Sequence, residues 1–360
     1  MVIKWRSILG GANDSNRIKE IDIAKGIGIL LVILGHMEDL TSDIWKQFAA
    51  SFHMPLFFLL CGFLFLENEP TLLNWKRFIQ KKAKHILIPY LLWALIYSNG
   101  IGVKQLICIF YANNKVYAEA GLWFLPTLFV AECLYYFIKL VTQHSKRLLE
   151  PCIVIVFAVL SFLMNQMAEG TAIERLGYPF SFDIALTAVV FIALGYWVKP
   201  VFFYILNFAN NNRNKMYLTL LGILCLLSVY IMSRINYNFI TDHTFDRVVM
   251  ARASYGLYPL FLVAAAVGSI GISLLCPMLK NIKILQYIGK NSLLYMCLNH
   301  FVIVIVMNIV EYMPFRIKSL PAFLEFIIVV IVLFCITVGC SLMSVILNRY
   351  LPVLNGKQKL

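Results

Sequence analysis

The sequence has few charged residues, and acidic side chains are the scarcest. Asp and Glu together number 18 in 360 residues, against 31 Lys and Arg, and charged residues make up 14% of the chain. Hydrophobic residues reach 61%, and the mean hydropathy is +0.80. A soluble domain of this composition would expose apolar patches over most of its surface, so that class is excluded. The chain is predicted to be a polytopic membrane protein.

The sequence also lacks a secretory signal and any cysteine pair of the metal-binding kind. Residues 1–21 are too polar and too interrupted by charge to form the apolar core of a signal peptide, so we expect an uncleaved, cytoplasmic start. None of the nine cysteines belongs to a CxxC motif, and nearly all lie inside apolar runs. Cysteine in such a setting packs as a small hydrophobic side chain, so we expect neither a disulfide framework nor a metal site.

The apolar runs predict an all-α protein with about ten transmembrane helices. A helix needs roughly 20 apolar residues to cross the hydrocarbon core. The candidate spans are 22–38, 48–66, 86–100, 121–140, 152–168, 181–198, 216–233, 255–276, 291–310 and 322–347. We therefore divide the chain into a cytoplasmic N-terminal segment (1–21), a transmembrane domain (22–348) and a cytoplasmic tail (349–360).

The distribution of basic residues orients these spans. With the N-terminus inside, 22 of the 31 basic residues fall on the cytoplasmic side, as the positive-inside rule requires. If one span were miscounted, every later loop would move to the opposite side of the membrane and this asymmetry would be lost. The predicted topology therefore has ten spans and both termini in the cytoplasm. The formal net charge of +13 is then explained by loops that face anionic lipid headgroups. Membrane lipids are the expected partners, and nucleic acid is not.

The first span carries an unusual line of ionisable residues. Lys25 and His36 are 11 positions apart, which places them on one helix face about 16 Å apart along the axis. Asp22 is three positions before Lys25 and is expected to pair with it. Gly26, Gly28 and Gly35 would allow a backbone or a ligand to approach closely. Ionisable residues inside a span usually serve function. The alternative is that Lys25 only extends to the membrane interface and that His36 lies at the outer boundary, bonded to a carbonyl group.

Three further residues are candidates for a site. His53 begins the second span, and a short loop joins the two spans, so His36 and His53 should lie near the same membrane face. Two imidazoles at one depth suggest acid–base chemistry, because histidine titrates near neutral pH. Glu132 lies inside the fourth span, where it either contacts a substrate hydroxyl, orients a histidine or pairs with Lys25. Trp123 either stacks on a sugar or belongs to the interfacial aromatic belt.

Five segments, in order, resemble the membrane-bound acyltransferase-3 family, most closely its short fucose 4-O-acetylase-like members. They are "RIKEIDIAKGIGILLVILGH", "FHMPLFFLLCGFLF", "WKRFIQKKAKHILIPYLLW", "GLWFLPTLF" and "IGKNSLLYMCLNH", and they cover nearly the whole chain. The family moves an acyl group, usually acetyl from cytoplasmic acetyl-CoA, onto sugars of surface polysaccharides, O-antigens or lipid-linked precursors.

The resemblance implies roles for particular residues. By position, His36 matches the family's essential histidine, Lys25 the basic residue before it, and His53 the histidine of the second motif, and with Asp22 these form the predicted catalytic set. The family's paired arginines match Lys81 and Lys84 best, and a shift of one position would match them to Lys82 and His85. Lysine in place of arginine replaces a bidentate phosphate ligand by a point charge. Cys61 stands where the family commonly has serine. We expect the acyl-CoA phosphates to bind at Arg77, Lys81, Lys82 and Lys84.

The predicted function is acetyl transfer from acetyl-CoA, as co-substrate and without a metal, to a hydroxyl of a cell-surface polysaccharide, O-antigen or lipid-linked sugar precursor. The predicted location is the bacterial cytoplasmic membrane. The thin arm of coenzyme A would thread past Lys25 towards His36, which acts either as general base or as the carrier of the acetyl group. Glu132 and Trp123 are the predicted acceptor-binding residues. The alternative is a secondary transporter or flippase for a lipid-linked sugar, although we find no internal repeat of the kind many transporters show.

Overall fold

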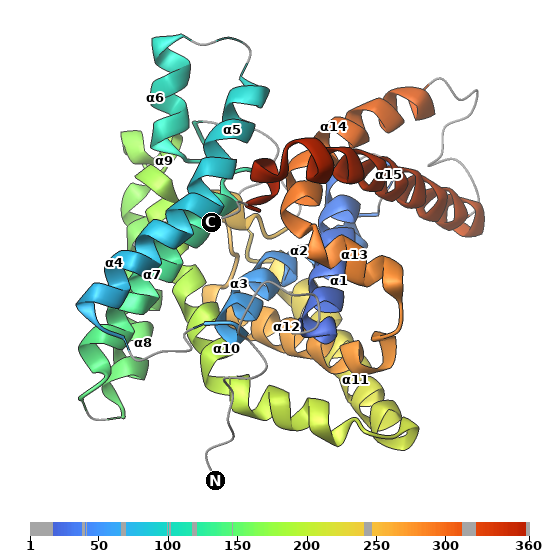
Figure 1. Cartoon of the computed structure of the whole chain (residues 1–360), viewed down its shortest axis with the longest axis horizontal. Coiled ribbons are helices and arrows are strands. Elements are labelled where there is room, and N and C mark those ends of the chain that lie inside the picture. Colours follow the sequence, from blue (N-terminus) through green and yellow to red (C-terminus); the bar gives the residue numbers. More distant parts are fainter. Residues whose placement is uncertain are drawn as a thin grey trace.

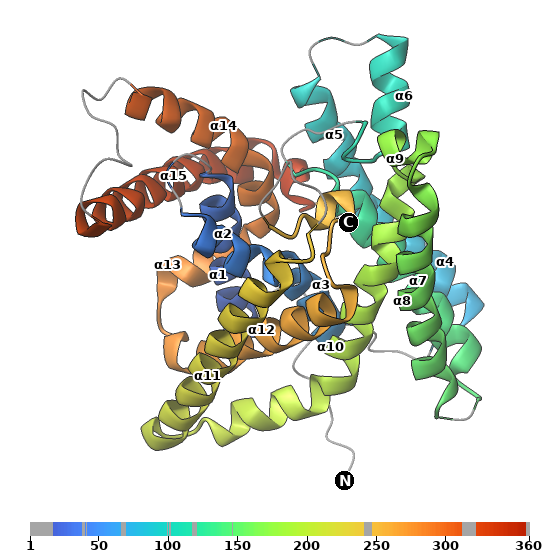
Figure 2. The ribbon, with the colours of Figure 1, turned by 180° about the vertical axis from the view of Figure 1, so that it is seen from behind.

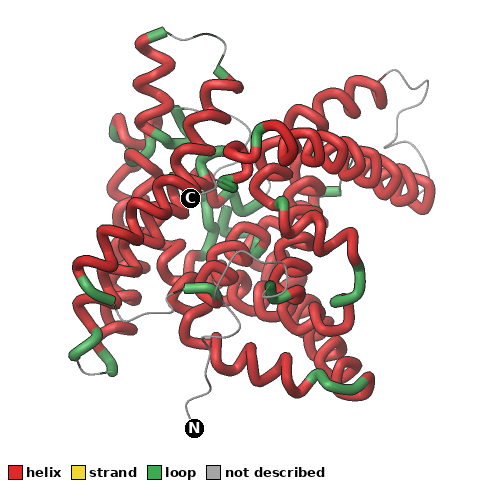
Figure 3. The backbone as a smooth tube through the Cα atoms, in the orientation of Figure 1, coloured by secondary structure: helices red, strands yellow, loops and turns green. Residues whose placement is uncertain are grey.

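The computed structural model is helical throughout the part of the chain that it describes (Figure 3). That part comprises residues 17–37, 40, 42–65, 70–98, 100, 102–116, 121–145, 147–240, 247–311 and 322–357, and every named regular element in it is a helix. The predicted all-α class is therefore confirmed. Of the predicted N-terminal segment, residues 1–16 lie outside the described residues, as do residues 358–360 of the tail.

Within the described residues, seven helices are long and apolar enough to cross a membrane. They coincide with the fourth to tenth predicted spans, which the long apolar runs specify directly. Helices of this kind are typical of a polytopic membrane protein. Their bounds are α7 (Phe124–Thr142), α8 (Leu149–Ala168), α10 (Phe182–Phe208), α11 (Asn212–Tyr237), α12 (Tyr258–Leu279), α14 (Ser292–Glu311) and α15 (Ala322–Tyr350).

The first three predicted spans have a different form. α1 (Lys19–His36) is a single helix, but four charged residues in its first seven positions keep it outside the set of apolar spans. The predicted span 48–66 is broken between α2 (Asp43–Ala50) and the short α3 (His53–Phe63). The predicted span 86–100 is the end of a longer rod that starts at α4 (Leu72–Lys82), continues through the π-helical η3 (Ala83–Leu87) and ends in α5 (Ile88–Tyr97). The count of ten and the orientation of the termini stay predictions.

Shorter elements complete the fold. Three of them are helices of five to nine residues, α6 (Val103–Tyr111), α9 (Ala172–Leu176) and α13 (Lys283–Lys290), and three are single 3₁₀ turns, η4 (Pro179–Ser181), η5 (Met250–Arg252) and η7 (Pro352–Asn355). Figures 1 and 2 show α1 and α3 in the middle of the bundle, with α4 to α9 on one side and α13 to α15 on the other.

The central helix α3 is buried because its neighbours reach its backbone. A Cβ added to Gly62 of α3 would collide with the carbonyl oxygen of Ile192 in α10, and one added to Gly195 of α10 would collide with the carbonyl oxygen of Leu59. Small residues of this kind let membrane helices pack backbone to backbone. Phe58, fully buried, packs its ring 5.0 Å from that of Phe124 at the start of α7. This contact joins the middle of α3 to the start of α7.

The glycines of α1 have separate surroundings. Gly26 lies against the backbone of Leu285 in α13, so the predicted close approach of another backbone occurs here. Gly28 faces the ring of Phe57, whereas nothing lies within 4 Å of a Cβ added to Gly35. The N-terminal half of α1 is therefore packed closely against α13, and the His36 end borders open space.

The end of the chain returns to the rod that carries the basic residues. The indole Nε1–H of Trp93 donates to the carbonyl oxygen of Leu354 at 3.1 Å, and His85 Nδ1 donates to that of Gly356 at 2.5 Å. The amide oxygen of Asn291 accepts from both Asn348 and Lys357. The described part of the predicted tail is thus a folded element packed against the bundle.

Candidate active site

α1 carries the two residues that the sequence analysis put on one face. The helix is unbroken from Lys19 to His36, so the rise between Lys25 and His36 is about 16 Å. Lys25 is half-buried in the body of the bundle, and His36, the last residue of the helix, is exposed. The two ends of α1 therefore belong to two different sites.

The histidine pocket surrounds the far end of α1. It is an open cavity of about 110 Å³ lined by residues of α1, α2, α3, α14, the turn before α7 and the loop after α11. His36, His53 and Trp123 all line it, and His36 and His53 are close enough to interact electrostatically. The pocket unites three residues from three separate segments, as the sequence analysis expected for the two histidines. Its volume equals that of a few water molecules.

His53 is held in one orientation by the backbone. Its Nδ1 lies 2.8 Å from the carbonyl oxygen of Ala49, one turn earlier. Because a carbonyl oxygen only accepts hydrogen bonds, Nδ1 must carry the proton, and in the neutral ring Nε2 then has the free lone pair. An imidazole fixed in this tautomer is ready to accept a proton.

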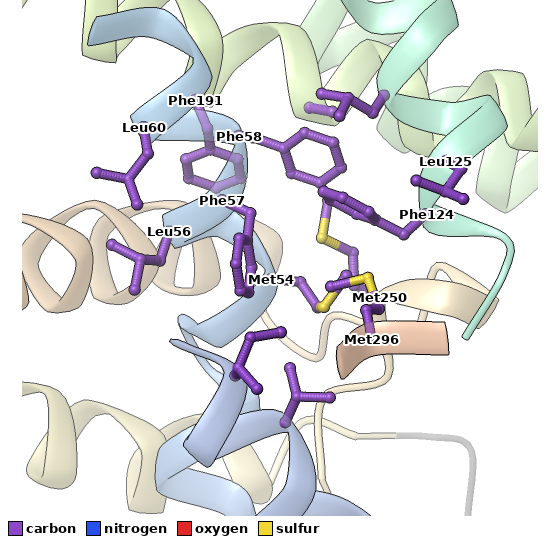
Figure 4. Packing of buried hydrophobic residues seen from close by; sticks show 14 of the residues in the cluster. Met54, Leu56, Phe57, Phe58, Leu60, Phe124, Leu125, Phe191, Met250 and Met296 are labelled. Carbon is purple, nitrogen blue, oxygen red and sulfur yellow. The ribbon is translucent and has the colours of Figure 1, made fainter. Parts of the chain in front are cut away.

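The base of the histidine pocket is apolar and rich in sulfur. Figure 4 shows Met54, Met250 and Met296 gathered beside Phe57 and Phe124, and the three methionines all line the pocket. Each methionine is buried. Thioether side chains fill irregular space and adapt to a ligand, so the polar groups of the pocket lie above a dry, deformable base.

Three polar residues of the histidine pocket were not among the predicted site residues: Lys46, Arg247 and Asn299. Asn299 is 2% exposed and donates through Nδ2 to the carbonyl oxygen of Met296 at 2.9 Å. Lys46 is buried and pairs with Asp43 at 3.1 Å. Arg247 interacts electrostatically with His53. These residues add hydrogen-bond donors and positive charge around the two imidazoles.

A second site, the inner charge cluster, lies nearer the start of α1 and contains Lys25, Cys61, Lys82 and Glu132. Lys82 Nζ and Glu132 Oε1 form an ion pair at 2.5 Å, and Glu132 is 2% exposed. Cys61 is within electrostatic reach of Lys25, Lys82 and Glu132. Burial alone would lower the pKa of Lys82, but the carboxylate of Glu132 outweighs it and raises the pKa above its usual value, so Lys82 keeps its charge.

The partner of Asp22 differs from the expected one. Arg17 donates to both carboxylate oxygens, from Nη2 to Oδ1 at 2.7 Å and from Nε to Oδ2 at 3.0 Å, and no ion pair joins Asp22 to Lys25. The guanidinium fork matches a carboxylate at two points, which a lysine ammonium cannot do. The predicted pairing is therefore corrected: Asp22 neutralises Arg17 and not Lys25.

The predicted acyl-CoA ligands divide into two groups. Arg77 and Lys81 are exposed one turn apart on α4, whereas Lys82 turns inward to Glu132. Lys84 is half-buried in the π-helical segment, and segments of this kind are frequent at functional sites. Glu132, predicted as an acceptor ligand, does not line the histidine pocket, and its role stays a prediction. Within the described residues, no group of three His, Cys, Asp or Glu side chains is arranged to hold a metal ion.

This geometry suits acyl transfer between a hydroxyl and an activated carbonyl group. An imidazole with a free lone pair takes the proton of a hydroxyl, and cationic or amide donors stabilise the oxyanion that forms. The inner charge cluster lies nearer the start of α1, and Arg77 and Lys81 are exposed on a separate helix, α4.

Comparison with known proteins gives one broad match and one short one. The profile of a family described as "Acyltransferase domain", acyltransferase-3, matches residues 18–345. Nodulation protein NolL of Sinorhizobium fredii (strain NBRC 101917 / NGR234) is 38% identical over 101 residues, which are 25% of this chain and 26% of NolL. The similarity thus spans about a quarter of either protein. No solved structure matches the chain.

Proposed function

The chain belongs to the acyltransferase-3 family, and from this premise we propose that it transfers an acetyl group from acetyl-CoA to a hydroxyl of a surface glycan or its lipid-linked precursor in the bacterial cytoplasmic membrane. The histidine pocket carries this proposal. Two imidazoles, one held with its lone pair free by Ala49, line a space large enough for the reacting groups alone. The family membership supports acyl transfer, and the donor and acceptor are part of the proposal.

In the proposed reaction His36 is the general base. Its ring removes the proton of the acceptor hydroxyl as the oxygen attacks the thioester carbonyl carbon. The carbon–sulfur bond breaks, the coenzyme A thiolate leaves with the electron pair, and the protonated imidazole returns the proton to it. Arg247 and Asn299 line the same pocket and would stabilise the negative oxygen of the tetrahedral intermediate. His53 holds His36 and the hydroxyl in register.

The donor is proposed to lie along α1. Arg77 and Lys81, exposed on α4, would bind the coenzyme A phosphates as point charges together with Lys84. The arm would pass Lys25 and bring the thioester to His36, because the rise of about 16 Å is close to the reach of an extended arm. The Lys82–Glu132 pair supports a place for Glu132 beside this path, and Trp123 is proposed to stack on the acceptor sugar.

The test is acetyl transfer by cells and membranes that carry the full chain. Replacing His36→Ala should abolish ester-linked acetate on extracted glycan, while the variant remains in the membrane at the wild-type amount. His300→Ala is the matched control, since His300 is an exposed histidine that packs near Tyr97 and does not line the pocket. Full acetate content in His36→Ala cells overturns the role of His36. Normal acetate content with loss of glycan export in a deletion strain would indicate the transporter alternative.

A further inference from the structure

A second and larger cavity, the polar cleft, opens beside the histidine pocket. Its volume is about 760 Å³, and its lining includes Lys115, Asn165, Glu169, Glu174, Arg175 and Arg252. These residues come from the loop after α6, the end of α8, the short helix α9 and the turn η5. In the predicted topology, all of these segments lie on the side of the membrane where α1 ends.

The two cavities differ in volume and can therefore hold different parts of a ligand. The histidine pocket, at about 110 Å³, holds only the reacting hydroxyl and the acyl group, and leaves the rest of a sugar outside. The polar cleft has a volume in the ~300–1,000 Å³ range of small-molecule sites. A saccharide that presents one hydroxyl to His36 therefore needs a neighbouring site of the size of this cleft.

One short loop lies between the two cavities. Residues 247–251 line the histidine pocket, and residues 252–254 line the polar cleft. The loop is closed by two backbone hydrogen bonds between Val249 and Ser254, of 2.9 and 3.2 Å, and Ala253 has a left-handed backbone with φ of 57°. Figures 1 and 2 show this yellow-to-orange segment crossing the middle of the molecule, between α2 and the α8–α9 side. A ligand in the cleft is thus one loop away from His36 and His53.

Hydrogen bonds brace the walls of the polar cleft. Asn165 Nδ2 donates to the carbonyl oxygen of Ala253 at 2.9 Å, which ties α8 to the shared loop. Lys115 Nζ donates to the carbonyl oxygen of Glu174 at 3.0 Å, and the backbone N–H of Gly170 donates to Glu174 Oε2 at 2.7 Å. The cleft is therefore formed before any ligand binds, which lowers the entropic cost of binding.

The charges of the polar cleft are mixed, and its acids are not neutralised by ion pairs. Neither Glu169 nor Glu174 forms an ion pair with a basic residue of the described chain. Carboxylates accept hydrogen bonds from hydroxyl groups, and Lys115 and Arg175 donate to hydroxyl, ring or carboxyl oxygens. This combination suits a ligand dense in hydroxyl groups more than a lipid tail or a polyanion.

We propose that the polar cleft binds the saccharide part of the acceptor and that the loop 247–254 guides the reacting hydroxyl from it into the histidine pocket. The proposal rests on the proposed function and names the acceptor site for it. Glu169 and Arg175 are the binding residues that face the sugar. They act on acceptor binding alone, because the donor approaches from the opposite end of α1.

The experiment uses membrane vesicles with the full chain, labelled acetyl-CoA, and host glycan freed of its ester groups by base as the acceptor probe. The variants are Glu169→Ala and Arg175→Ala. Each should raise the glycan concentration needed for half-maximal transfer about tenfold, the effect of removing one charge-assisted hydrogen bond. The KM for acetyl-CoA should stay at the wild-type value. Lys104→Ala, which removes an exposed cation of α6 outside the cleft, is the matched control and should change neither value.

The outcomes separate this inference from the proposed function. Wild-type vesicles that leave labelled acetyl-CoA unused with the glycan present contradict the proposed function itself. If wild type transfers acetyl and both cleft variants keep its glycan dependence, the proposed function stands and the saccharide site is wrong. A rise in the KM for acetyl-CoA without any change for glycan would assign the cleft to the donor, and this result also overturns the proposal.

Discussion

The two ends of α1 are built from different chemistry. At the His36 end, two imidazoles, an indole and an amide line an open cavity, and a nearby carbonyl fixes the tautomer of His53. At the Lys25 end, the acids are buried and bound to cations, Asp22 to Arg17 and Glu132 to Lys82. One end holds imidazole rings that line a cavity, and the other holds charges that are bound in ion pairs.

This difference predicts acid–base chemistry at the His36 end of the helix and charge placement at the Lys25 end. Removal of a proton-exchanging group removes a chemical step but leaves the fold, because an exposed or pocket-lining imidazole supports little packing. Removal of one member of a buried ion pair leaves an uncompensated charge in the interior and destabilises the fold itself. Lys25 is the intermediate case, since its half-buried ammonium lies near the pair without an ion pair to Asp22. Variants at the two ends should therefore fail in different assays.

After the loss of activity expected for His36→Ala, the next largest effect is expected at His53. His53→Ala should lower the initial rate of acetyl transfer by about 10²–10⁴-fold, the usual contribution of a positioned acid–base group, with the protein still in the membrane. The double variant with His36→Ala should be no slower than the slower single variant, because residues that act as a unit are not additive. Initial rates with labelled acetyl-CoA in vesicles measure this. A His53→Ala enzyme near the wild-type rate would restrict the chemistry to His36.

A large effect on the stability of the protein is expected for a variant at Lys82. Lys82→Met should destabilise the protein by about 3–5 kcal/mol, because it leaves the carboxylate of Glu132 buried and unpaired. Thermal unfolding in detergent measures the loss. Lys81→Met is the matched control, since Lys81 is exposed on the same helix and surface charges contribute little.

Restoring stability identifies the cause. The double variant Lys82→Met with Glu132→Gln removes both charges and should recover most of the lost stability. If Lys82→Met unfolds at the wild-type temperature, the ion pair does not stabilise the fold. Lys82 would then be a candidate phosphate ligand together with Arg77 and Lys81.

Hydropathy predicted the helices that correspond to long apolar runs, and it did not predict the helix break inside the run 48–66. The seven spans from α7 onward follow from composition alone. The run 48–66 is almost uniformly apolar, so nothing in its hydropathy marks the turn at Ser51 and Phe52 that separates α2 from α3. Residues 72–85 lie between two predicted spans, and their basic residues did not indicate a helix. The chain is nevertheless helical there and continues without a break into α5.

The two histidines of the pocket could be predicted because ionisable residues are rare at the ends of apolar runs. A histidine at the end of an apolar run indicates a task, and this signal selected His36 and His53, which line one pocket; their part in catalysis stays a prediction. Arg247 and Asn299 gave no such signal: one lies in a polar loop and the other is an amide in an apolar helix, and tertiary packing alone brings them to the pocket. The Arg17–Asp22 pair was missed because helical spacing favoured Lys25, whereas a guanidinium before the helix matches both carboxylate oxygens.

Lys25 is expected to have a moderate effect, on the donor alone. Lys25→Met should raise the KM for acetyl-CoA about tenfold, the loss of one hydrogen bond to a charged group, while glycan dependence and membrane content stay unchanged. Steady-state kinetics in vesicles and immunoblots of the membrane fraction measure the two parts. Lys19→Met, at the exposed first residue of the same helix, is the control. A collapse of expression in Lys25→Met instead would make Lys25 part of the structural end of α1.

The smallest effect is expected at the exposed cations of α4. Arg77→Ala and Lys81→Ala should each raise the KM for acetyl-CoA by up to about fivefold at low salt, since an exposed charge pair contributes about 0.2–1 kcal/mol. The difference from wild type should shrink as salt is added, because the screening length falls to about 8 Å at physiological ionic strength. Lys76→Ala removes a cation from a neighbouring face of the same helix and should have less effect. If the KM for acetyl-CoA changes neither with salt nor in either variant, the donor phosphates do not bind at α4. The basic residues there would then serve only to orient the chain in the membrane.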